Sequence, residues 1–515
     1  PGKDVVQIYA AQPRTELPKA DKLLVGFAKT GLLHPGEQET VTASFPYASL
    51  ASYDEEKSAW MLEQGEYGIY AGKNSRELQP EAALVLERTI VTEQCRPLFR
   101  GEKADQLFPK HSAGVSYSCP KILIDPESIP PVTHTYTGAP TALSAPTRRV
   151  SLSDVTAGKA PAAELAGQLT PEELALLCIG AARVSFTDFS VIGNASKSIP
   201  GAAGDTTDRL EGYGIPQCAM ADGPAGIRVN PKVYQRGDTY INNVEEDPIL
   251  GKVLPPELRK VDLSGTEIKD QYCTALPVAV QLAQSWNPKL AELAGDIAGA
   301  EMEELGIDLW LAPGMNIQRN PLCGRNFEYY SEDPYLSGIF AAAVTRGVQK
   351  HPGKGTCIKH LAANNQETCR STSNSHVSER TLREIYLRGF EICVKEAQPF
   401  SAMTSMNLLN GVHTANDQDL LTHALRDEWG FDGIVMTDWG TTGQFVSVGE
   451  DRKYGPSTPV GCILVGNDLI MPGTSFDEDT LFAAIRDGSL PVAALQDCGK
   501  RLIELLVKCT PGRKG

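Results

Sequence analysis

The first 95 residues alternate short apolar runs with turn residues. We expect strands at 5–9, 22–27, 40–45 and 65–72. Within 40–45, polar and apolar residues alternate with a period of two, and His34-Pro35-Gly36 marks a turn before this segment. Short strands separated by turns are typical of an antiparallel β-sandwich. We therefore predict a β-sandwich over residues 1–95.

After this region the pattern changes twice. Residues 96–150 are rich in Pro, Ser and Thr, and we expect a linker or a surface wrap there. From residue 151 on, helical segments alternate with short apolar runs. The expected helices begin at Pro171, behind a Thr170 cap, and cover 289–305 and 382–397; the expected strands are 218–221, 308–312, 355–358, 402–406, 433–437 and 468–471. This alternation predicts an α/β fold with a parallel sheet, and the length of 151–515 suits a (β/α)8 TIM-like barrel.

Polar side chains gather where these expected strands end. In chain order they are Asp222, then Asn316, Arg319, Arg325 and Glu328, then Lys359 and His360, then Asn407 and Asn410, and finally Asp438. In a barrel the carboxyl ends of all strands open on one face, where the active site lies. A pocket that offers carboxylates, cations and amides together matches the hydroxyl groups of a sugar, which both donate and accept hydrogen bonds.

Composition and charge narrow the choice of partners. The chain has 515 residues, of which 41% are hydrophobic and 22% charged, as in an ordinary globular protein. A formal net charge of −16 repels phosphate backbones and anionic lipids, so we expect neither nucleic acid nor membrane as a partner. The 12 cysteines form no CxxC pair, so we expect reduced thiols in a cytoplasmic enzyme, without a metal or a cofactor.

Four motifs follow one another at the expected strand ends. They are Ala-Asp-Gly-Pro at 221–224, Gly-Arg-Asn-Phe-Glu at 324–328, Lys-His-Leu-Ala at 359–362 and Val-Met-Thr-Asp-Trp at 435–439. Together they resemble the sugar-binding and nucleophile motifs of glycoside hydrolase family 3. Residues 1–95 resemble the fibronectin type III-like module of that family, and we expect its first strand to be missing. The resemblance implies a retaining β-glycosidase that releases terminal non-reducing β-D-glucose from a β-glucoside or oligosaccharide by double displacement.

The resemblance also implies a role for each motif residue. Asp438 would be the nucleophile, and Asp222 would hold the hydroxyls of the non-reducing sugar that lie farthest from the cleaved bond. Glu328 would orient Arg325. The other substrate-binding residues would be Arg325, Lys359, His360, Met406, which stands where many family members have Tyr, and Trp439 as an apolar wall.

The general acid/base is the group that these motifs do not supply. In most two-domain family members it is a Glu on an α/β sandwich domain that follows the barrel. Here the β-sandwich precedes the barrel, and the chain starts at Pro1 and stops at Gly515. We therefore expect a permuted member cut from a longer protein, with the acid/base on a companion α/β sandwich domain or chain.

Two other interpretations stay open. A β-N-acetylglucosaminidase-like hydrolase would use His376 as its acid/base, although the Pro-Gly-His-Gly signature of such enzymes is absent. A non-catalytic sugar-binding fragment would use the same pocket without turnover.

Overall fold

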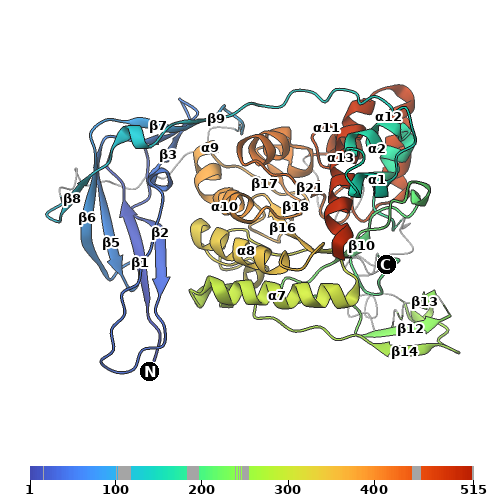
Figure 1. The fold of residues 1–515 in the computed structure, drawn as a ribbon, viewed down its shortest axis with the longest axis horizontal. Coiled ribbons are helices and arrows are strands. Elements are labelled where there is room, and N and C mark those ends of the chain that lie inside the picture. Colours follow the sequence, from blue (N-terminus) through green and yellow to red (C-terminus); the bar gives the residue numbers. More distant parts are fainter. Residues whose placement is uncertain are drawn as a thin grey trace.

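The first part of the chain folds into two facing β-sheets (Figure 1). The computed structural model describes residues 1–15, 17–99, 101, 117–182, 196–237, 239–241, 243, 245, 255–442 and 454–512. One sheet has the order β2 (Leu23–Lys29), β1 (Val5–Ala11), β5 (Gly65–Gly72), β6 (Leu78–Leu86) and β8 (Lys121–Leu123). The other has the order β3 (Ser52–Asp54), β4 (Ala59–Leu62), β7 (Ile90–Gln94) and β9 (Val132–Thr133). Apolar side chains such as Tyr53, Trp60 and Tyr67 fill the core of this part.

Three of the four strands expected here are confirmed as β1, β2 and β5. The strand expected at 40–45 is wrong, because this segment joins neither sheet. Its burial does alternate: Val41, Ala43 and Phe45 are half-buried, whereas Thr42 and Ser44 are exposed. The period of two therefore reflects one face packed against the sandwich rather than pairing in a ladder.

The predicted linker contributes to the sandwich. The short strands β8 and β9 lie within 96–150 and pair in parallel with β6 and β7, respectively. Beyond β9 the chain runs across the α/β part toward α1 (Leu152–Thr156) (Figure 1). On this path Leu143 N donates a hydrogen bond to Gln496 Oε1, 2.7 Å away. The segment thus combines two sandwich strands with a surface wrap.

The second part is built on a mainly parallel sheet. Its order is β10 (Gly204–Asp205), β11 (Ala219–Ala221), β15 (Leu309–Trp310), β16 (Gly355–Leu361), β18 (Ser401–Thr404) and β21 (Ile434–Met436). Only β10 is antiparallel to its neighbour. The α/β class is therefore confirmed, as are five of the six strands expected beyond residue 151.

The expected closed barrel of eight strands is wrong for the described residues, which form a half-barrel of six strands. The sixth expected strand, 468–471, makes only single parallel bridges, Met436 with Leu469 and Ile179 with Ile470. Pro472 follows directly and has no N–H to extend a ladder. Residues 468–471 therefore link β21 to the segment near Ile179 through single bridges, where one full strand was expected.

Helices pack around this sheet (Figure 1). They are α2 (Ala162–Gln168), α3 (Pro171–Leu177), α6 (Ala279–Gln284), α7 (Pro288–Leu305), α8 (Pro334–Val348), α9 (Glu379–Thr381), α10 (Arg388–Ala397), α11 (Pro459–Leu464), α12 (Ser475–Asp487), α13 (Val492–Cys509) and the π-helical η6 (Leu382–Tyr386) and η8 (Asp419–Glu428). The short α5 (Pro256–Arg259) lies between β13 and β14 in the sequence. Thr170 caps α3 as expected. The helix expected at 382–397 is divided into η6 and α10. No helix in the described ranges combines the length and apolar character needed to cross a membrane.

Small sheets lie outside this framework. They are β13 (Thr239–Ile241), β12 (Lys232–Arg236) and β14 (Glu267–Asp270) in one, and β17 (Asn374–Ser375), β19 (Leu408–Leu409) and β20 (Val412–His413) in the other.

Buried polar contacts join the sandwich to the helices beside it. Tyr53 Oη donates to Glu379 Oε1 at 3.0 Å, and Tyr136 Oη donates to Glu428 Oε1 at 2.7 Å. Arg383, only 4% exposed, donates to both of these carboxylates, at 2.9 Å to Glu379 and 2.6 Å to Glu428. The paired charges and hydrogen bonds fix how the sandwich sits against α9, η6 and η8.

Candidate active site

Asp222 and Lys359 form a largely buried ion pair between two strands, β11 and β16, that β15 separates in the sheet. Asp222 follows β11, and its Oδ1 accepts a hydrogen bond from Lys359 Nζ at 2.6 Å. Its Oδ2 accepts a second from Arg228 at 2.6 Å. Burial alone would raise the pKa of Asp222, but the Lys359 and Arg228 cations outweigh it and lower the pKa to about 2. Asp222 is therefore a charged acceptor at neutral pH.

His360 is held in place through its backbone. Its N–H donates to Asn316 Oδ1 at 2.8 Å, and Asn316 Nδ2 donates to the His360 carbonyl at 2.8 Å. The imidazole is 2% exposed. Burial, together with the Arg325 and Lys359 cations, holds the pKa of His360 well below its usual value. The neutral ring can donate through one nitrogen and accept through the other, and its buried Nδ1 has no hydrogen-bond partner among the described residues.

Asp438 follows β21 and turns one carboxylate oxygen toward His360. Oδ1 accepts a hydrogen bond from Trp439 N at 2.7 Å, whereas Oδ2 lies 3.9 Å from His360 Nε2. Thr441 Oγ1 donates to the Asp438 carbonyl at 2.8 Å and so fixes the turn. The Asp438 side chain is 15% exposed. It therefore combines a defined orientation with access for a small molecule.

Arg325 and Trp439 border this group. Arg325 Nε donates to Glu328 Oε1, and both side chains are largely buried. Burial would lower the pKa of Arg325, but Tyr329, Glu328 and Asp438 raise it above its usual value. The half-buried Trp439 indole donates through Nε1 to the Ala203 carbonyl at 2.9 Å. That hydrogen bond fixes the plane of the ring.

Several residues expected at the site have other contacts. Met406 is half-buried and lies 3.9 Å from Ser371 Oγ through its Sδ. Asn407 donates to the Ala362 carbonyl at 3.2 Å, and Asn410 donates to the Val377 carbonyl at 2.9 Å. These two amides therefore hold loops together. Arg228, which binds Asp222, was not predicted for the site; its place six residues after Asp222 was the available signal.

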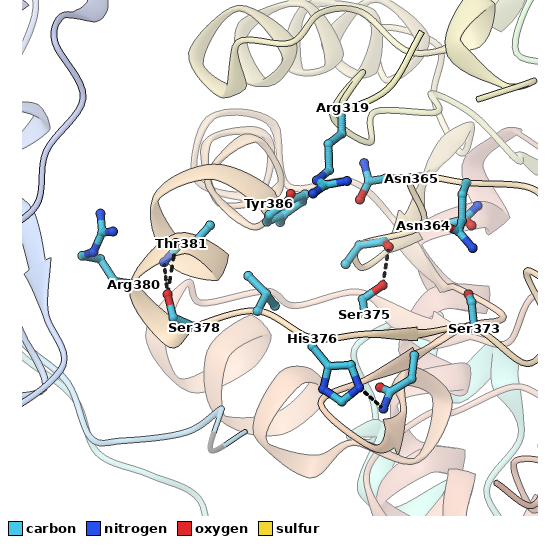
Figure 2. A pocket seen from close by; sticks show the side chains of 14 residues that line it. Arg319, Asn364, Asn365, Ser373, Ser375, His376, Ser378, Arg380, Thr381 and Tyr386 are labelled. Carbon is cyan, nitrogen blue, oxygen red and sulfur yellow. Dashed lines mark hydrogen bonds between the residues drawn. The ribbon is translucent and has the colours of Figure 1, made fainter. Parts of the chain in front are cut away.

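His376 lies at a neighbouring cavity of about 540 Å³ (Figure 2). Asn374 Nδ2 lies 3.0 Å from His376 Nε2. Arg319, Asn364 and Tyr386 line the same cavity, whereas Asp222 and Asp438 do not. His376 is therefore not grouped with the proposed nucleophile.

Comparison with known proteins gives two family matches. Residues 256–505 match the glycosyl hydrolase family 3 N terminal domain, and residues 4–75 match a fibronectin type III-like domain. Beta-glucosidase A of Butyrivibrio fibrisolvens is 34% identical over 485 residues, which are 88% of this chain and 52% of that protein. A beta-glucosidase of Ruminococcus albus is 34% identical over 523 residues, which are 98% of this chain and 49% of that protein.

A solved structure shares the arrangement of both parts. The crystal structure of a beta-glucosidase from Paenibacillus barengoltzii matches 98% of this chain with a TM-score of 0.77 and 33% identity, and 52% of that chain is covered. This chain thus spans about half the length of these relatives. The two family matches and these similarities show that the chain belongs to glycosyl hydrolase family 3.

Proposed function

We propose that this chain carries the nucleophile and the glucose-binding site of a retaining β-glucosidase. The observation that carries the proposal is the placement of Asp438 Oδ2 at 3.9 Å from His360, whose neighbour Lys359 binds Asp222. A nucleophilic carboxylate and a set of hydroxyl ligands thus come from three strands. The relatives named beta-glucosidases support the substrate class.

Asp438 would attack the anomeric carbon with Oδ2. The C1–O bond to the leaving group breaks as the Asp438–C1 bond forms, and water then hydrolyses the glycosyl-enzyme. The hydrogen bond from Trp439 N to Oδ1 at 2.7 Å would hold the other oxygen in its attacking orientation. Asp438 is one of the groups that raise the pKa of Arg325, so a guanidinium cation lies near the attacking carboxylate.

The remaining residues would bind sugar hydroxyls. Asp222 would accept hydrogen bonds from the hydroxyls farthest from the cleaved bond, while Lys359 and Arg325 would donate to hydroxyl oxygens. His360 Nε2 would interact with a hydroxyl beside Asp438. Trp439 would form the apolar wall, and Met406 would contact the sugar where a phenol would otherwise stand.

We place the acid/base outside these motifs. Three carboxylates near the site are each paired with a cation: Asp222 with Lys359, Glu328 with Arg325, and Glu367 with Arg370. Each of these carboxylates already binds a side-chain cation, so none of the three is left unpaired to act as the general acid. A companion α/β sandwich domain or chain would supply the acid/base. Within this chain we propose a division into 1–95, 96–150 and 151–515.

An activated aryl β-glucoside tests the proposal. The native chain is compared with Asp438→Asn and with the matched control Asp432→Asn, whose carboxylate is on the surface and pairs with Lys508. We expect Asp438→Asn to lose at least about 1,000-fold in the rate of phenolate release, whereas glucose binding and the control stay near native. Equal rates for Asp438→Asn and the native chain would refute the proposal.

A further inference from the structure

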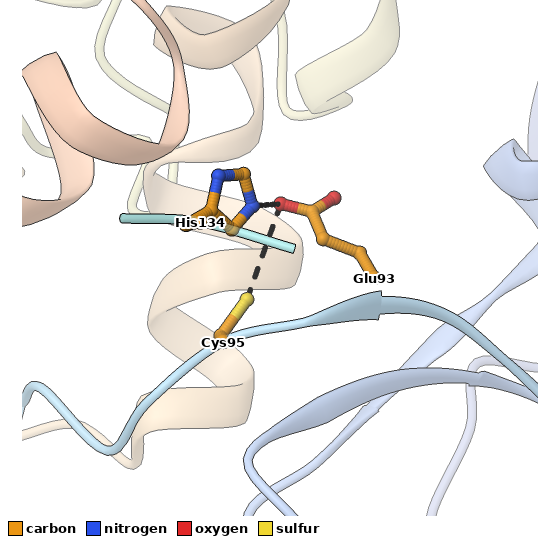
Figure 3. A group of neighbouring side chains, drawn as sticks. All are labelled: Glu93, Cys95 and His134. Atoms are coloured by element: carbon orange, nitrogen blue, oxygen red, sulfur yellow. Dashed lines mark hydrogen bonds and ion pairs between the residues drawn. The ribbon is translucent and has the colours of Figure 1, made fainter. Parts of the chain in front are cut away.

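Glu93, Cys95 and His134 meet at the edge of the β3-β4-β7-β9 sheet (Figure 3). Glu93 lies in β7 and Cys95 follows two positions later, so both side chains project from the same face. β9 pairs in parallel with β7, with Glu93 opposite Val132 and Gln94 opposite Thr133. His134 is the next residue and comes to lie beside Cys95. Two paired strands thus assemble three metal-ligating side chains.

The distances suit one tetrahedral metal ion. His134 Nε2 lies 2.8 Å from Glu93 Oε1, and Cys95 Sγ lies 3.9 Å from the same oxygen. One ligand atom from each residue lies within 4.8 Å of the other two. Zinc bonds of about 2.0–2.3 Å separate tetrahedral ligands by roughly 3.3–3.7 Å. Small side-chain movements therefore convert the observed group into a coordination shell.

The surroundings hold these side chains in place. His134 and Glu93 are 7% and 17% exposed, and Cys95 is buried. Cys95 N donates to the Ser58 carbonyl at 2.9 Å, and Arg96 N donates to Tyr136 Oη at 3.0 Å. Ligands on a fixed backbone lose little freedom when a metal binds.

Burial and the carboxylates of Glu428, Glu93 and Glu391 raise the pKa of the Cys95 thiol, against the lowering effect of the Arg383 cation. The metal ion itself must therefore displace the thiol proton. A carboxylate and a thiolate supply two negative charges, which balance one divalent ion. The mixture of sulfur, imidazole and carboxylate ligands is the set that zinc accepts.

We propose that Glu93, Cys95 and His134 bind one Zn²⁺, with water as the fourth ligand. On binding, the Cys95 S–H bond breaks, its proton passes to solvent, and the sulfur forms a bond to zinc. The ion would fasten the chain after β9 to the end of β7. It stands apart from the Asp438 site and does not depend on the function proposed there.

Metal titration of the full chain tests the site. The chain is stripped with a chelator, and Zn²⁺ is titrated in competition with a chromophoric chelator. We expect one tight equivalent per chain, and affinity weakened on the order of 100-fold in Cys95→Ser and in His134→Gln. The control Cys369→Ser, at an exposed cysteine, should keep native affinity. Absence of a tight equivalent, or equal affinity in all four proteins, overturns the proposal.

Co²⁺ substitution and a gentler variant keep the test decisive. Bound Co²⁺ should give a thiolate charge-transfer band in the native chain, and a spectrum without that band would exclude Cys95 as a ligand. Glu93→Gln keeps a side-chain oxygen that can bond to His134, so it should fold even if Cys95→Ser does not. This variant should also weaken Zn²⁺ binding, and native affinity in it would count against the coordination set.

Discussion

His360 Nε2 lies 3.9 Å from Asp438 Oδ2, although the two residues belong to strand ends that are not neighbours. β18 separates β16 from β21 in the sheet, and it pairs with both. Side chains from alternate strands of such a sheet project over the strand between them. The contact therefore marks the base of the proposed sugar site. Lys359, from the same strand as His360, binds Asp222, which follows β11.

Asp222 should distinguish glucosides from xylosides. Its carboxylate is charged and accepts from two cations, so it can also bind the 4- and 6-hydroxyls of glucose. Loss of one buried charged hydrogen bond costs about 1.5–3 kcal/mol, or roughly a tenfold to hundredfold fall in kcat/KM. Paired aryl β-glucosides and β-xylosides measure this preference, and Asp222→Asn should reduce it. Equal kcat/KM values for the two native substrates would contradict the assignment.

Lys359 and Arg228 should differ in their effect on the pH profile. Burial raises the pKa of Asp222, and Lys359 is the first of the cations that lower it to about 2. In Lys359→Met the pKa of Asp222 should rise, so the charged form, and kcat/KM with it, should be lost on acidification at a higher pH than in the native chain. The Arg228 side chain is 44% exposed, against 3% for Lys359.

Arg228→Met is therefore the matched comparison. Its acid limb should move less, because water screens an exposed cation. The profiles of kcat/KM against pH for both variants and the native chain give the result. A larger shift in Arg228→Met would show that the buried ion pair is not the dominant influence on Asp222.

Much of the site could be predicted because its residues follow apolar strand runs. Asp222, Lys359 and Asp438 were each placed by an apolar run that ends in a polar motif, and β11, β16 and β21 confirm those runs. The run 468–471 is apolar too, but its hydrogen bonds are single bridges. The sequence pattern indicates which side chains are buried, but not which backbone groups are hydrogen-bonded. A complete barrel strand was therefore predicted at 468–471.

The same lack of information on backbone pairing explains the two errors in the β-sandwich, a wrong strand at 40–45 and the missed strand β9. Residues 40–45 show alternating burial without a ladder, whereas β9 is only two residues long within a Pro-rich segment. Such a short strand carries no periodic signal. The proximity of Glu93 and His134 depends on β9 and therefore could not be predicted from the sequence.

Acid/base assistance should be the missing component of turnover by this chain alone. Such assistance contributes typically about 10²–10⁴-fold, so cellobiose should be cleaved poorly and activated aryl β-glucosides much better. A companion α/β sandwich domain should restore cellobiose cleavage, and azide should speed the second step. Cellobiose hydrolysis by the isolated chain at an ordinary enzymatic rate would place an acid/base within residues 1–515.

Glu384 should make the interface between sandwich and helices sensitive to pH. Its Oε1 accepts from Tyr53 N at 2.8 Å, and burial raises its pKa to about 7, against the lowering effect of that bond and of Arg380. A raised folded pKa favours the protonated form, so this stabilisation is complete at low pH. It is lost as the pH rises from about 4.5 to 7, by up to about 3 kcal/mol.

Thermal unfolding across this pH range measures the effect. Glu384→Gln should remove the loss of stability that ionisation of Glu384 causes. The Tm of the variant should therefore increase relative to the native Tm as the pH rises. Glu55→Gln is the control, because exposed Glu55 also contacts the helices, through Arg380 N at 2.8 Å. Parallel curves for Glu384→Gln and the native chain would mean that Glu384 does not titrate in this range.

The most direct test of the account is covalent labelling of the nucleophile. A 2-deoxy-2-fluoro-β-D-glucoside with a dinitrophenolate leaving group forms the glycosyl-enzyme without needing an acid and slows its hydrolysis. Peptide mass spectrometry then locates the label. We predict one fluoroglucosyl group per chain on Asp438, and none in Asp438→Asn. A label on any other residue, Asp222 included, would contradict the account.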